Sequence, residues 1–467
     1  MIRRILSLTS KDFVRGISVG SYYEHAGIFD VAQGIDFTRS PGLLTAGYSA
    51  VEISATINEA IVSMDTDPTN DYLWAYGDAN SIWRITMTTN GPVVELTPGD
   101  VGTAAPKGNG IIYNNEYIYT QKTQIGKATG IGGASPTFNS TAVAVTITSS
   151  DYHPTFIGPD GKLYIGADGA ENSANYIGRY DGTTHNSAVL DLPVGYVPTC
   201  FETDGKYLII GATRSPGNVT GNFSSKVFFW DMWSPSWNHE WSLGNGVINS
   251  LKRLGNWIYA FNQRSLQALT FKDAPARILT KAITNILFNV QHGGADEFRG
   301  QLGWGEEHGW TYGSIDKRLS PIINNPFKLP TGNTVASSFK TISPTKVYIG
   351  TMGTTDRLYS FSTGNETATA TTALIDLGRP WKITGIKITR KDAAGSVVAA
   401  VQDAGGNNII SGTFDETTIL SKMLKDPGNV SNVTEQIIID LDLTGSIEIK
   451  KVEVFGELVE ISHADLR

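Results

Sequence analysis

Two acidic residues and a histidine lie between tryptophans in the segment GWGEEHGW, at positions 303–310. Glu306 and Glu307 are adjacent, and paired carboxylates beside aromatic rings are groups that can cleave a glycosidic bond. Neighbouring residues on a strand point to opposite faces, so these two side chains converge only if they lie in a turn. The segment therefore favours a hairpin turn between framework residues Trp304 and Trp310 over an active site.

A formal G-x-S-x-G match occurs at Gly16, Ser18 and Gly20. In hydrolases this motif places a nucleophilic serine between a strand and a helix of a parallel α/β sheet. The flanking sequence SYYEHAGIF and the rest of the chain indicate β-structure instead. The motif therefore predicts a turn rather than a catalytic serine.

The segment DTDPTND offers side-chain oxygens from Asp65, Asp67, Asn70 and Asp71. Closely spaced oxygen ligands suit calcium, but the spacing and the glycine of an EF-hand loop are missing. The pattern favours a polar turn between two strands, with a calcium site as the alternative.

Four tryptophans occur in FFWDMWSPSWNHEWSL, at positions 228–243. Trp230 and Trp241 lie in strand-like runs and are predicted to be core residues. Trp233 and Trp237 flank the turn-forming sequence Ser-Pro-Ser, where an exposed aromatic ring can stack on a sugar or anchor a protein contact. We therefore name Trp233 and Trp237 as candidate surface contacts. With no P-loop, H-E-x-x-H, zinc-type or dinucleotide-binding spacing in the sequence, we predict no catalytic residue, no cofactor and no metal site.

The chain has 467 residues, a formal net charge of -8 and a charged fraction of 18%. This balance disfavours a nucleic-acid-binding surface, which would carry a basic stripe. Cys200 is the only cysteine, so an internal disulfide is excluded and a reducing compartment is expected. We expect neither a secretory signal nor a membrane span, because the N-terminal apolar stretch is short and no run approaches spanning length.

A short aromatic and aliphatic triplet recurs along the chain at intervals of about 45 residues, the period of a propeller blade. A single blade cannot bury its apolar residues without neighbours. The sequence therefore predicts an all-β fold with a β-propeller of about seven blades. The seven copies are Tyr72-Leu73-Trp74, Tyr117-Ile118-Tyr119, Leu163-Tyr164-Ile165, Tyr207-Leu208-Ile209, Trp257-Ile258-Tyr259, Trp310-Thr311-Tyr312 and Val347-Tyr348-Ile349.

The repeat divides the chain into an extended N-terminal arm at 1–55, the propeller at 56–364 and a C-terminal β-sandwich at 365–467. Two short helices are predicted, one from the helical spacing of apolar residues between Ile278 and Leu287 and one at 418–425. The arm cannot build a core alone, so we expect it to lie across the propeller and the sandwich, or across a neighbouring subunit. The apolar arm residues that need burial are Phe13, Ile17, Tyr22, Tyr23, Phe29, Ile35 and Phe37.

Three stretches resemble β-propeller virion proteins of tailed bacteriophages, particularly tail nozzle or tail-tip proteins of short-tailed phages. They are the arm DFVRGISVG with GIDFTRSPGLLTAGYSA, the blade phrases KVFFWD and WNHEWSLGNGVINSLKRLGNWIYAF, and the ending DLGRPWKITGIKI with SIEIKKVEVFGE. No single motif is specific, because propellers serve many functions. The resemblance implies a virion tail protein that is assembled in the host cytoplasm and contacts other virion proteins.

The expected function is a non-enzymatic structural subunit, a tail nozzle or hub that forms part of the DNA conduit. A homo-oligomeric ring is expected, through which genomic DNA passes without sequence-specific binding. A receptor- or glycan-binding tail protein is the alternative, with a host surface glycan as its partner. A propeller glycosidase is the third hypothesis, and it needs carboxylates on the inner strands, where the sequence indicates few.

Overall fold

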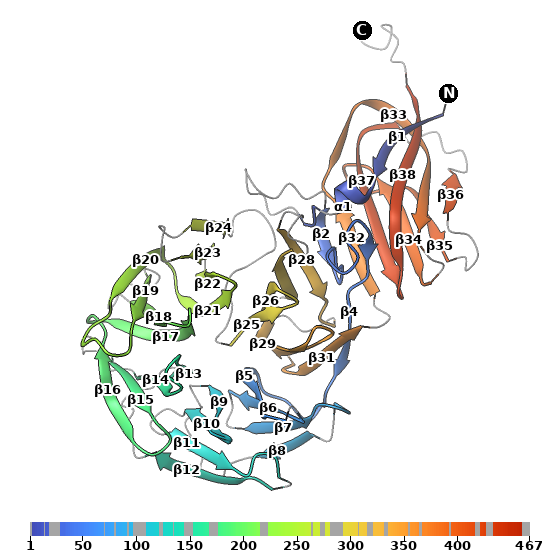
Figure 1. The fold of residues 1–467 in the computed structure, drawn as a ribbon. Helices are drawn as coiled ribbons and strands as arrows, with labels where there is room; N and C mark the ends of the chain where they lie inside the picture. Colours follow the sequence, from blue (N-terminus) through green and yellow to red (C-terminus); the bar gives the residue numbers. More distant parts are fainter. Residues whose placement is uncertain are drawn as a thin grey trace.

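The computed structural model describes the residues 2–13, 15–17, 29–69, 71–78, 81–90, 93–96, 109–120, 125–133, 135–143, 153–167, 176–214, 223–262, 265–270, 276–280, 293–306, 308–314, 321–330, 335–353, 355–363, 367–391, 394–415, 421–425 and 433–459. Within them the fold is almost entirely β, with seven four-stranded sheets in a ring and a ten-stranded sheet beside it (Figure 1). The prediction of an all-β, seven-bladed propeller is confirmed.

Each blade is an antiparallel sheet of four strands, and in the first six blades these strands follow one another in the chain. The strands are, blade by blade, β5 (Ile61–Thr66), β6 (Tyr72–Gly77), β7 (Ile82–Thr86) and β8 (Val93–Leu96); β9 (Gly110–Tyr113), β10 (Glu116–Thr120), β11 (Ile125–Thr129) and β12 (Thr137–Val143); β13 (Thr155–Ile157), β14 (Leu163–Ala167), β15 (Tyr176–Tyr180) and β16 (His185–Asp191); β17 (Tyr196–Thr203), β18 (Leu208–Arg214), β19 (Ser224–Trp230) and β20 (His239–Asn245); β21 (Ile248–Leu254), β22 (Trp257–Asn262), β23 (Ser265–Leu269) and β24 (Ala276–Thr280); β25 (Ala295–Phe298), β26 (Gln301–Gly305), β27 (Gly309–Gly313) and β28 (Ile322–Phe327); β29 (Val335–Ser343), β30 (Lys346–Met352), β31 (Leu358–Thr363) and β4 (Tyr48–Glu52).

Six of the seven recurring triplets mark the second strand of their blade, where buried side chains meet the neighbouring blade. Between blades 3 and 4, for example, the ring of Tyr164 packs edge-on against Trp230, with the ring centroids 5.9 Å apart. Tight turns separate the first two strands, and Asn114 and Asn115 both adopt positive φ in the turn predicted for blade 2. Each blade is thus stabilised by burial against the next.

Blade 6 departs from the pattern, because its triplet at Trp310 lies on the third strand, β27, and not on the second. The second strand, β26, has Gly303 at its centre. A Cβ atom there would lie 2.7 Å from the ring of Phe339 in blade 7. The space that a large residue fills in other blades is occupied here by a neighbour's phenyl ring.

The ring closes through β4, which comes from the N-terminal arm and pairs with β31 as the outer strand of blade 7. Tyr48, at the start of β4, is buried between the rings of Phe298 and Phe327. The pairing of β4 with β31 therefore ties the chain just before blade 1 to blade 7.

The C-terminal sheet is bent, and its two layers enclose one core as a half-barrel. In the first layer β38 lies between β1 and β33, and in the second β37 lies between β32 and β34. The long strand β33 joins the layers, since it pairs with both β37 and β38. The strands are β1 (Arg3–Leu8), β2 (Phe29–Gln33), β3 (Leu44–Thr45), β32 (Thr367–Thr372), β33 (Ile375–Arg390), β34 (Ser396–Gln402), β35 (Asn408–Phe414), β36 (Ser421–Lys425), β37 (Val433–Thr444) and β38 (Glu448–Leu458).

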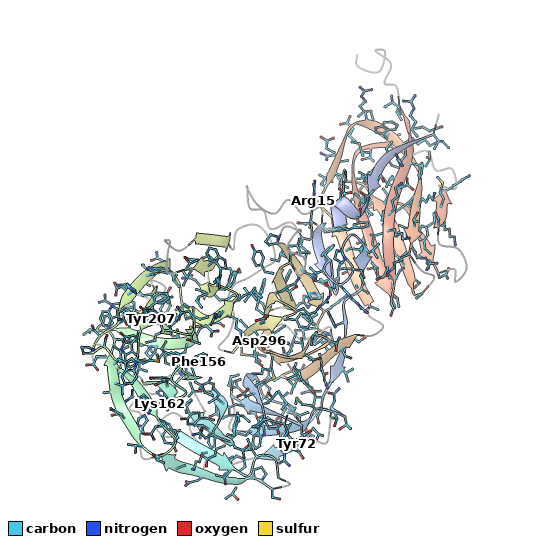
Figure 2. All side chains as sticks on the ribbon, viewed as in Figure 1. Arg15, Tyr72, Phe156, Lys162, Tyr207 and Asp296 are labelled. Atoms are coloured by element: carbon cyan, nitrogen blue, oxygen red, sulfur yellow. The ribbon has the colours of Figure 1, made fainter. Side chains whose placement is uncertain are left out.

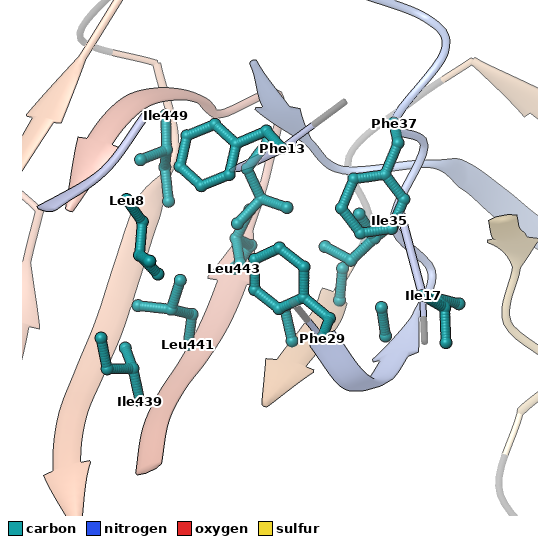
Figure 3. Close-up of a cluster of buried hydrophobic side chains, with 14 of the residues drawn as sticks. Leu8, Phe13, Ile17, Phe29, Ile35, Phe37, Ile439, Leu441, Leu443 and Ile449 are labelled. Carbon is teal, nitrogen blue, oxygen red and sulfur yellow. The ribbon is translucent and has the colours of Figure 1, made fainter. Parts of the chain in front are cut away.

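The N-terminal arm lies across both parts of the molecule. Its strands β1 and β3 pair with β38, and β2 pairs with β32. Figure 3 shows the buried arm residues facing the inner side of the C-terminal sheet, and the same apolar cluster continues to Ile323 and Trp304 of blade 6. Tyr22 and Tyr23 lie outside the described residues. The other arm residues that needed burial are almost fully buried: Phe13, Ile17, Phe29, Ile35 and Phe37.

A polar centre joins the arm to blade 6. The buried carboxylate of Asp36 accepts hydrogen bonds from its own turn, from Asn324 and from Arg299. Arg299 also donates to the hydroxyl of Tyr48, at 2.9 Å. The turn Arg-Ser-Pro-Gly that follows Asp36 is fixed at its base by these contacts.

Both helix predictions are wrong where they can be examined. The segment Ala276–Thr280 is strand β24, and Ser421–Lys425 is strand β36. The register of β24 with β23 and of β36 with β33 explains the outcome, because each segment completes a sheet edge and tertiary pairing outweighs local helical spacing. Residues 281–292 and 416–420 lie outside the described part. The one helix among the described residues is α1 (Ser10–Phe13), and no described helix is long and apolar enough to cross a membrane.

Candidate functional site

The centre of the propeller is a cavity of about 210 Å³ that receives residues from the first strand of all seven blades. Asp296 and Phe156 lie beside this central opening in Figure 2. Its volume is below the roughly 300 Å³ at which small-molecule sites usually begin. The residue types that line it decide what it can do.

Charges of opposite sign alternate around one side of the cavity. Lys340 contacts Asp65 at 3.0 Å, and Lys252 contacts Asp296 at 2.7 Å. Glu202 is buried within the electrostatic reach of Lys252. These five residues come from blades 1, 7, 6, 5 and 4, so the ion pairs cross blade boundaries.

Each of the three carboxylates also accepts a backbone hydrogen bond from the first strand of the following blade. This repeated contact fixes one blade against the next through a charge-assisted bond. The three bonds are Ile112 N–H to Asp65 Oδ2 at 2.8 Å, Arg253 N–H to Glu202 Oε2 at 3.0 Å and Thr341 N–H to Asp296 Oδ2 at 2.9 Å.

The pKa directions follow from this arrangement. Burial alone would raise the pKa of Asp296, but Lys252 and Lys340 outweigh it and hold that pKa below its ordinary value. Burial would lower the pKa values of both lysines, and their carboxylate partners raise them instead. For Glu202 burial prevails over Lys252 and raises the pKa. Asp296 is therefore held as an anion between two ammonium groups, an arrangement suited to cross-linking blades rather than to general acid catalysis.

The sequence indicated few acids on the inner strands, and the structure corrects this by placing Asp65, Glu202 and Asp296 there. Asp65 was named from the sequence only as a possible calcium ligand, and its lysine partner, like that of Asp296, lies in a neighbouring blade. Asp296 lies in the irregular blade 6, where the repeat gives no register. The recurrence of an acid on first strands was the signal available.

The segment 303–310 forms the turn between β26 and β27, as predicted. Trp304 and Trp310 are buried and stacked, with ring centroids 6.5 Å apart. Glu306 is buried and its N–H donates to the carbonyl of His308 at 2.8 Å. The Nδ1 atom of His308 accepts the N–H of Leu329, and burial lowers the pKa of this histidine to about 4. Glu307 lies outside the described residues, so the arrangement of the two carboxylates, the alternative to the favoured hairpin turn, is not tested.

The segment DTDPTND forms a polar turn in its described part. Asp67 accepts hydrogen bonds from the N–H groups of Thr69 and Tyr72, at 3.3 and 2.7 Å. The side chain of Asp65 instead lines the central cavity. Asn70, like Ser18 of the G-x-S-x-G match, lies outside the described residues. Among the residues that the structure describes, no three of His, Cys, Asp and Glu gather in a way that could hold a metal ion.

The two candidate contact tryptophans have different environments on the loop between β19 and β20. Trp233 is 85% exposed, the largest exposed fraction among the large apolar residues described. Trp237 is half-buried and packs edge-on against Phe228, at 5.3 Å between centroids. Of the two predicted core residues, Trp230 is buried and Trp241 half-buried. Trp233 alone is free to contact a partner with its whole ring.

Asp231 holds this loop in one shape. Its carboxylate accepts hydrogen bonds from the N–H groups of Trp233 and Ser234, from the Ser234 hydroxyl and from the side chain of Asn238. Its own N–H donates to Asn238 Oδ1 at 2.8 Å. Met232 adopts a φ of 68°, a conformation that costs free energy in a residue with a side chain. The loop is therefore a strained, pre-organised support for Trp233.

Comparisons with known proteins give structural similarities but no family assignment. No protein-family profile matches the chain, and no curated protein matches its sequence. Among solved structures, the Dos1 propeller aligns with a TM-score of 0.43 and 12% identity, covering 65% of this chain and 78% of that one. The β-propeller domain of Cps50 (Swd1) from Myceliophteria thermophila aligns with a TM-score of 0.45 and 9% identity, covering 68% and 99%. At these values the similarity concerns the propeller architecture alone.

Proposed function

We propose that this protein is a non-enzymatic structural subunit of a tailed bacteriophage virion, a tail nozzle or hub that contributes to the DNA conduit. The observation that carries the proposal is the arm, which pairs with strands of both the last blade and the C-terminal sheet. A load applied to one part is transmitted to the other through backbone pairing and a continuous apolar cluster. Such a tied body suits a subunit that must withstand the passage of a genome.

The conduit in this proposal lies between copies of the chain and not along the propeller axis. The axial cavity of about 210 Å³ is lined on one side by the ion pairs Asp65–Lys340 and Asp296–Lys252. A DNA duplex, whose major groove alone is about 12 Å wide, does not fit there. A closed ring of subunits would supply the passage, with other virion proteins as neighbours and the host cytoplasm as the place of assembly.

The test is mass spectrometry of purified virions followed by cryo-electron microscopy of the particle. We expect the chain in stoichiometric amounts, in a ring around the tail axis. Absence from the particles would exclude this function.

A receptor- or glycan-binding role is the second candidate, and the exposure of Trp233 favours it. An indole face can stack on a sugar ring without a deep pocket. A glycan array probed with the wild-type protein and with Trp233→Ala would test it. Binding to host envelope sugars that the substitution abolishes would support this role, and no binding by either protein would remove it.

A further inference from the structure

The first strand of each blade contributes one equivalent residue to a ring around the central cavity. These positions recur at about the blade period of 45 residues. The acids Asp65, Glu202 and Asp296 each accept the N–H that directly follows the equivalent position on the next blade. Five of the seven positions carry the charged residues described above. The other two are Ile111 in blade 2 and Phe156 in blade 3, and both line the cavity.

The charges alternate in sign around this ring until the two apolar residues interrupt them. From Asp65 the order is acid, lysine, acid, lysine and acid, and it ends at Glu202. Phe156 and Ile111 occupy the gap between Glu202 and Asp65, and Phe156 lies across the central opening from Asp296 (Figure 2). When Glu202 is ionised, three carboxylates outnumber two ammonium groups. One cation in the gap would complete both the alternation and the charge balance.

Glu202 is the acid of the ring that lacks a contacting cation. Its side chain is 8% exposed, and its two oxygens accept the N–H groups of Thr203 and Arg253, at 2.9 and 3.0 Å. Asp65 and Asp296 each contact a lysine, but among the described residues no cation lies within ion-pair distance of Glu202. Burial therefore prevails and raises the pKa of Glu202. A buried carboxylate without a counter-ion is a group that a bound cation would stabilise.

The residues of the gap favour an organic ammonium ion over a metal ion or an anion. An ammonium group placed over the half-buried ring of Phe156 gains cation–π attraction, and Ile111 offers apolar surface to an alkyl chain. A metal ion needs several ligands, and the described residues bring together no three of His, Cys, Asp and Glu for one. An anion would meet three carboxylates and two lysines that are already paired, at 2.7 and 3.0 Å.

The volume of the cavity limits the size of the ion. About 210 Å³ gives room for roughly seven groups the size of a water molecule, which is enough for a short alkylammonium ion such as butylammonium. The side chains of Lys252 and Lys340 are 28% and 27% exposed, so the ring is open to solvent. The cavity can therefore exchange its contents with the surrounding solution.

We propose that the central cavity binds a small alkylammonium ion in the gap between Glu202 and Asp65. The ammonium group lies against the Glu202 carboxylate and the Phe156 ring, and the alkyl chain packs on Ile111. The bound ion completes the ring of alternating charges and links blades 2 and 3 to the five blades that carry the charged residues. This site goes beyond the structural role proposed above and does not depend on it.

Isothermal titration calorimetry of the full chain with butylammonium chloride tests the proposal, at mildly alkaline pH, which favours the ionised form of Glu202. Sodium chloride is the inorganic cation and butan-1-ol the neutral molecule for comparison, and neither should bind. Glu202→Gln keeps the shape of the side chain and removes its charge, so it should weaken butylammonium binding at least about 10-fold. Glu240→Gln, at an exposed position of the same blade, is the matched control and should leave the affinity unchanged.

Phe156→Lys gives a second test that does not depend on the Glu202 variant. It places an ammonium group of the chain itself in the gap, so it should abolish butylammonium binding. Its melting temperature should exceed that of Phe156→Met, which has an unbranched side chain without the charge. Circular dichroism shows whether each variant is folded.

Four results would each overturn the proposal. They are no binding of butylammonium by the wild-type protein, equally tight binding of butan-1-ol, displacement of butylammonium by an equal concentration of sodium, and unchanged affinity in Glu202→Gln or Phe156→Lys. Equally tight binding of the alcohol would show a merely apolar cavity, and displacement by sodium would show a site for inorganic cations. Finding the chain in virions, or not finding it there, leaves these outcomes unaffected.

Discussion

The central cavity of the propeller, here called the channel, and the junction of the arm with the C-terminal sheet both join distant parts of the chain, but by different forces. In the channel, paired charges bridge neighbouring blades, as Lys252 and Asp296 do. In the junction, side chains such as Phe29 and Phe37 are buried, with ring centroids 5.4 Å apart. Ion pairs removed from water recover little net free energy, whereas apolar burial is the main stabilising term. The channel therefore sets the geometry of the blades, and the junction supplies stability.

The largest effect should follow deletion of residues 1–40, which removes β1 and β2 but leaves β4. Each buried apolar side chain of the junction contributes about 1.5–3 kcal/mol to the free energy of unfolding. Without them the C-terminal sheet should unfold, and assembly into particles should be abolished. The propeller should remain closed by β4. Limited proteolysis with mass spectrometry would detect a protected propeller fragment, and Lys11→Ala, at an exposed arm position, is the control.

Normal incorporation of the truncated chain into particles would contradict this expectation. A loss of the propeller as well would mean that the ring depends on the arm beyond the pairing of β4.

A single junction residue should give the next largest effect. Phe29→Ala removes a fully buried ring that contacts Phe13 and Phe37. We expect a loss of about 3–5 kcal/mol in the free energy of unfolding, measured by urea titration. A loss below 1 kcal/mol would show that the junction is not the stabilising region.

Asp296→Asn should lower the free energy of unfolding by less, roughly 1–3 kcal/mol at neutral pH, because the partly exposed end of Lys252 can become hydrated. The pKa of Asp296 is lowered from 3.8 by Lys252 and Lys340 against burial, so its contribution is present above pH 3.8 and is lost as pH falls through the folded pKa. The variant should therefore lose less stability than the wild type as the pH falls. Thermal melts between about pH 2 and 7, which bracket the usual carboxyl pKa range, would measure this.

Glu202→Gln should change the pH dependence of stability in the opposite direction from Asp296→Asn. Burial raises the pKa of Glu202 from 4.5, so its contribution is present below pH 4.5 and is lost as pH rises through the folded pKa. This variant should remove a decline of stability above pH 4.5. The same slope change in both variants would contradict the pKa assignments.

The smallest effect should come from His308. Burial lowers its pKa from 6.5 to about 4, so the neutral ring is favoured in the folded state. Its contribution is present above pH 6.5 and is lost as pH falls towards 4. In His308→Gln the melting temperature should fall less than in the wild type as the pH drops from 6.5 to about 4, with little change at pH 8. An unchanged acid slope would show that the histidine is hydrated in solution.

The sequence predicted the regions whose signal is local and repeated. Triplets such as Tyr117-Ile118-Tyr119 recur because every second strand meets the same kind of neighbour, and they identified seven blades. Blade 6 broke the register because Phe339 occupies the place of a local residue at Gly303. The ion pairs of the cavity were not predicted because partners such as Asp296 and Lys252 lie in different blades. Strand β24 was misassigned because its apolar spacing fits a helix as well as a sheet edge.

The pairing of β1 with β38 has a consequence for the time at which the protein can be completed. Arg4 and Glu453, which form an ion pair across these strands, are 449 positions apart in the chain. At the usual rate of synthesis of about 5–20 residues per second, the first strand waits roughly 20 to 90 seconds for its partner. During that interval the arm exposes unpaired edges, so a ribosome that stops early releases a chain that cannot finish folding. A chain that stops before β38 therefore leaves β1 without its partner strand.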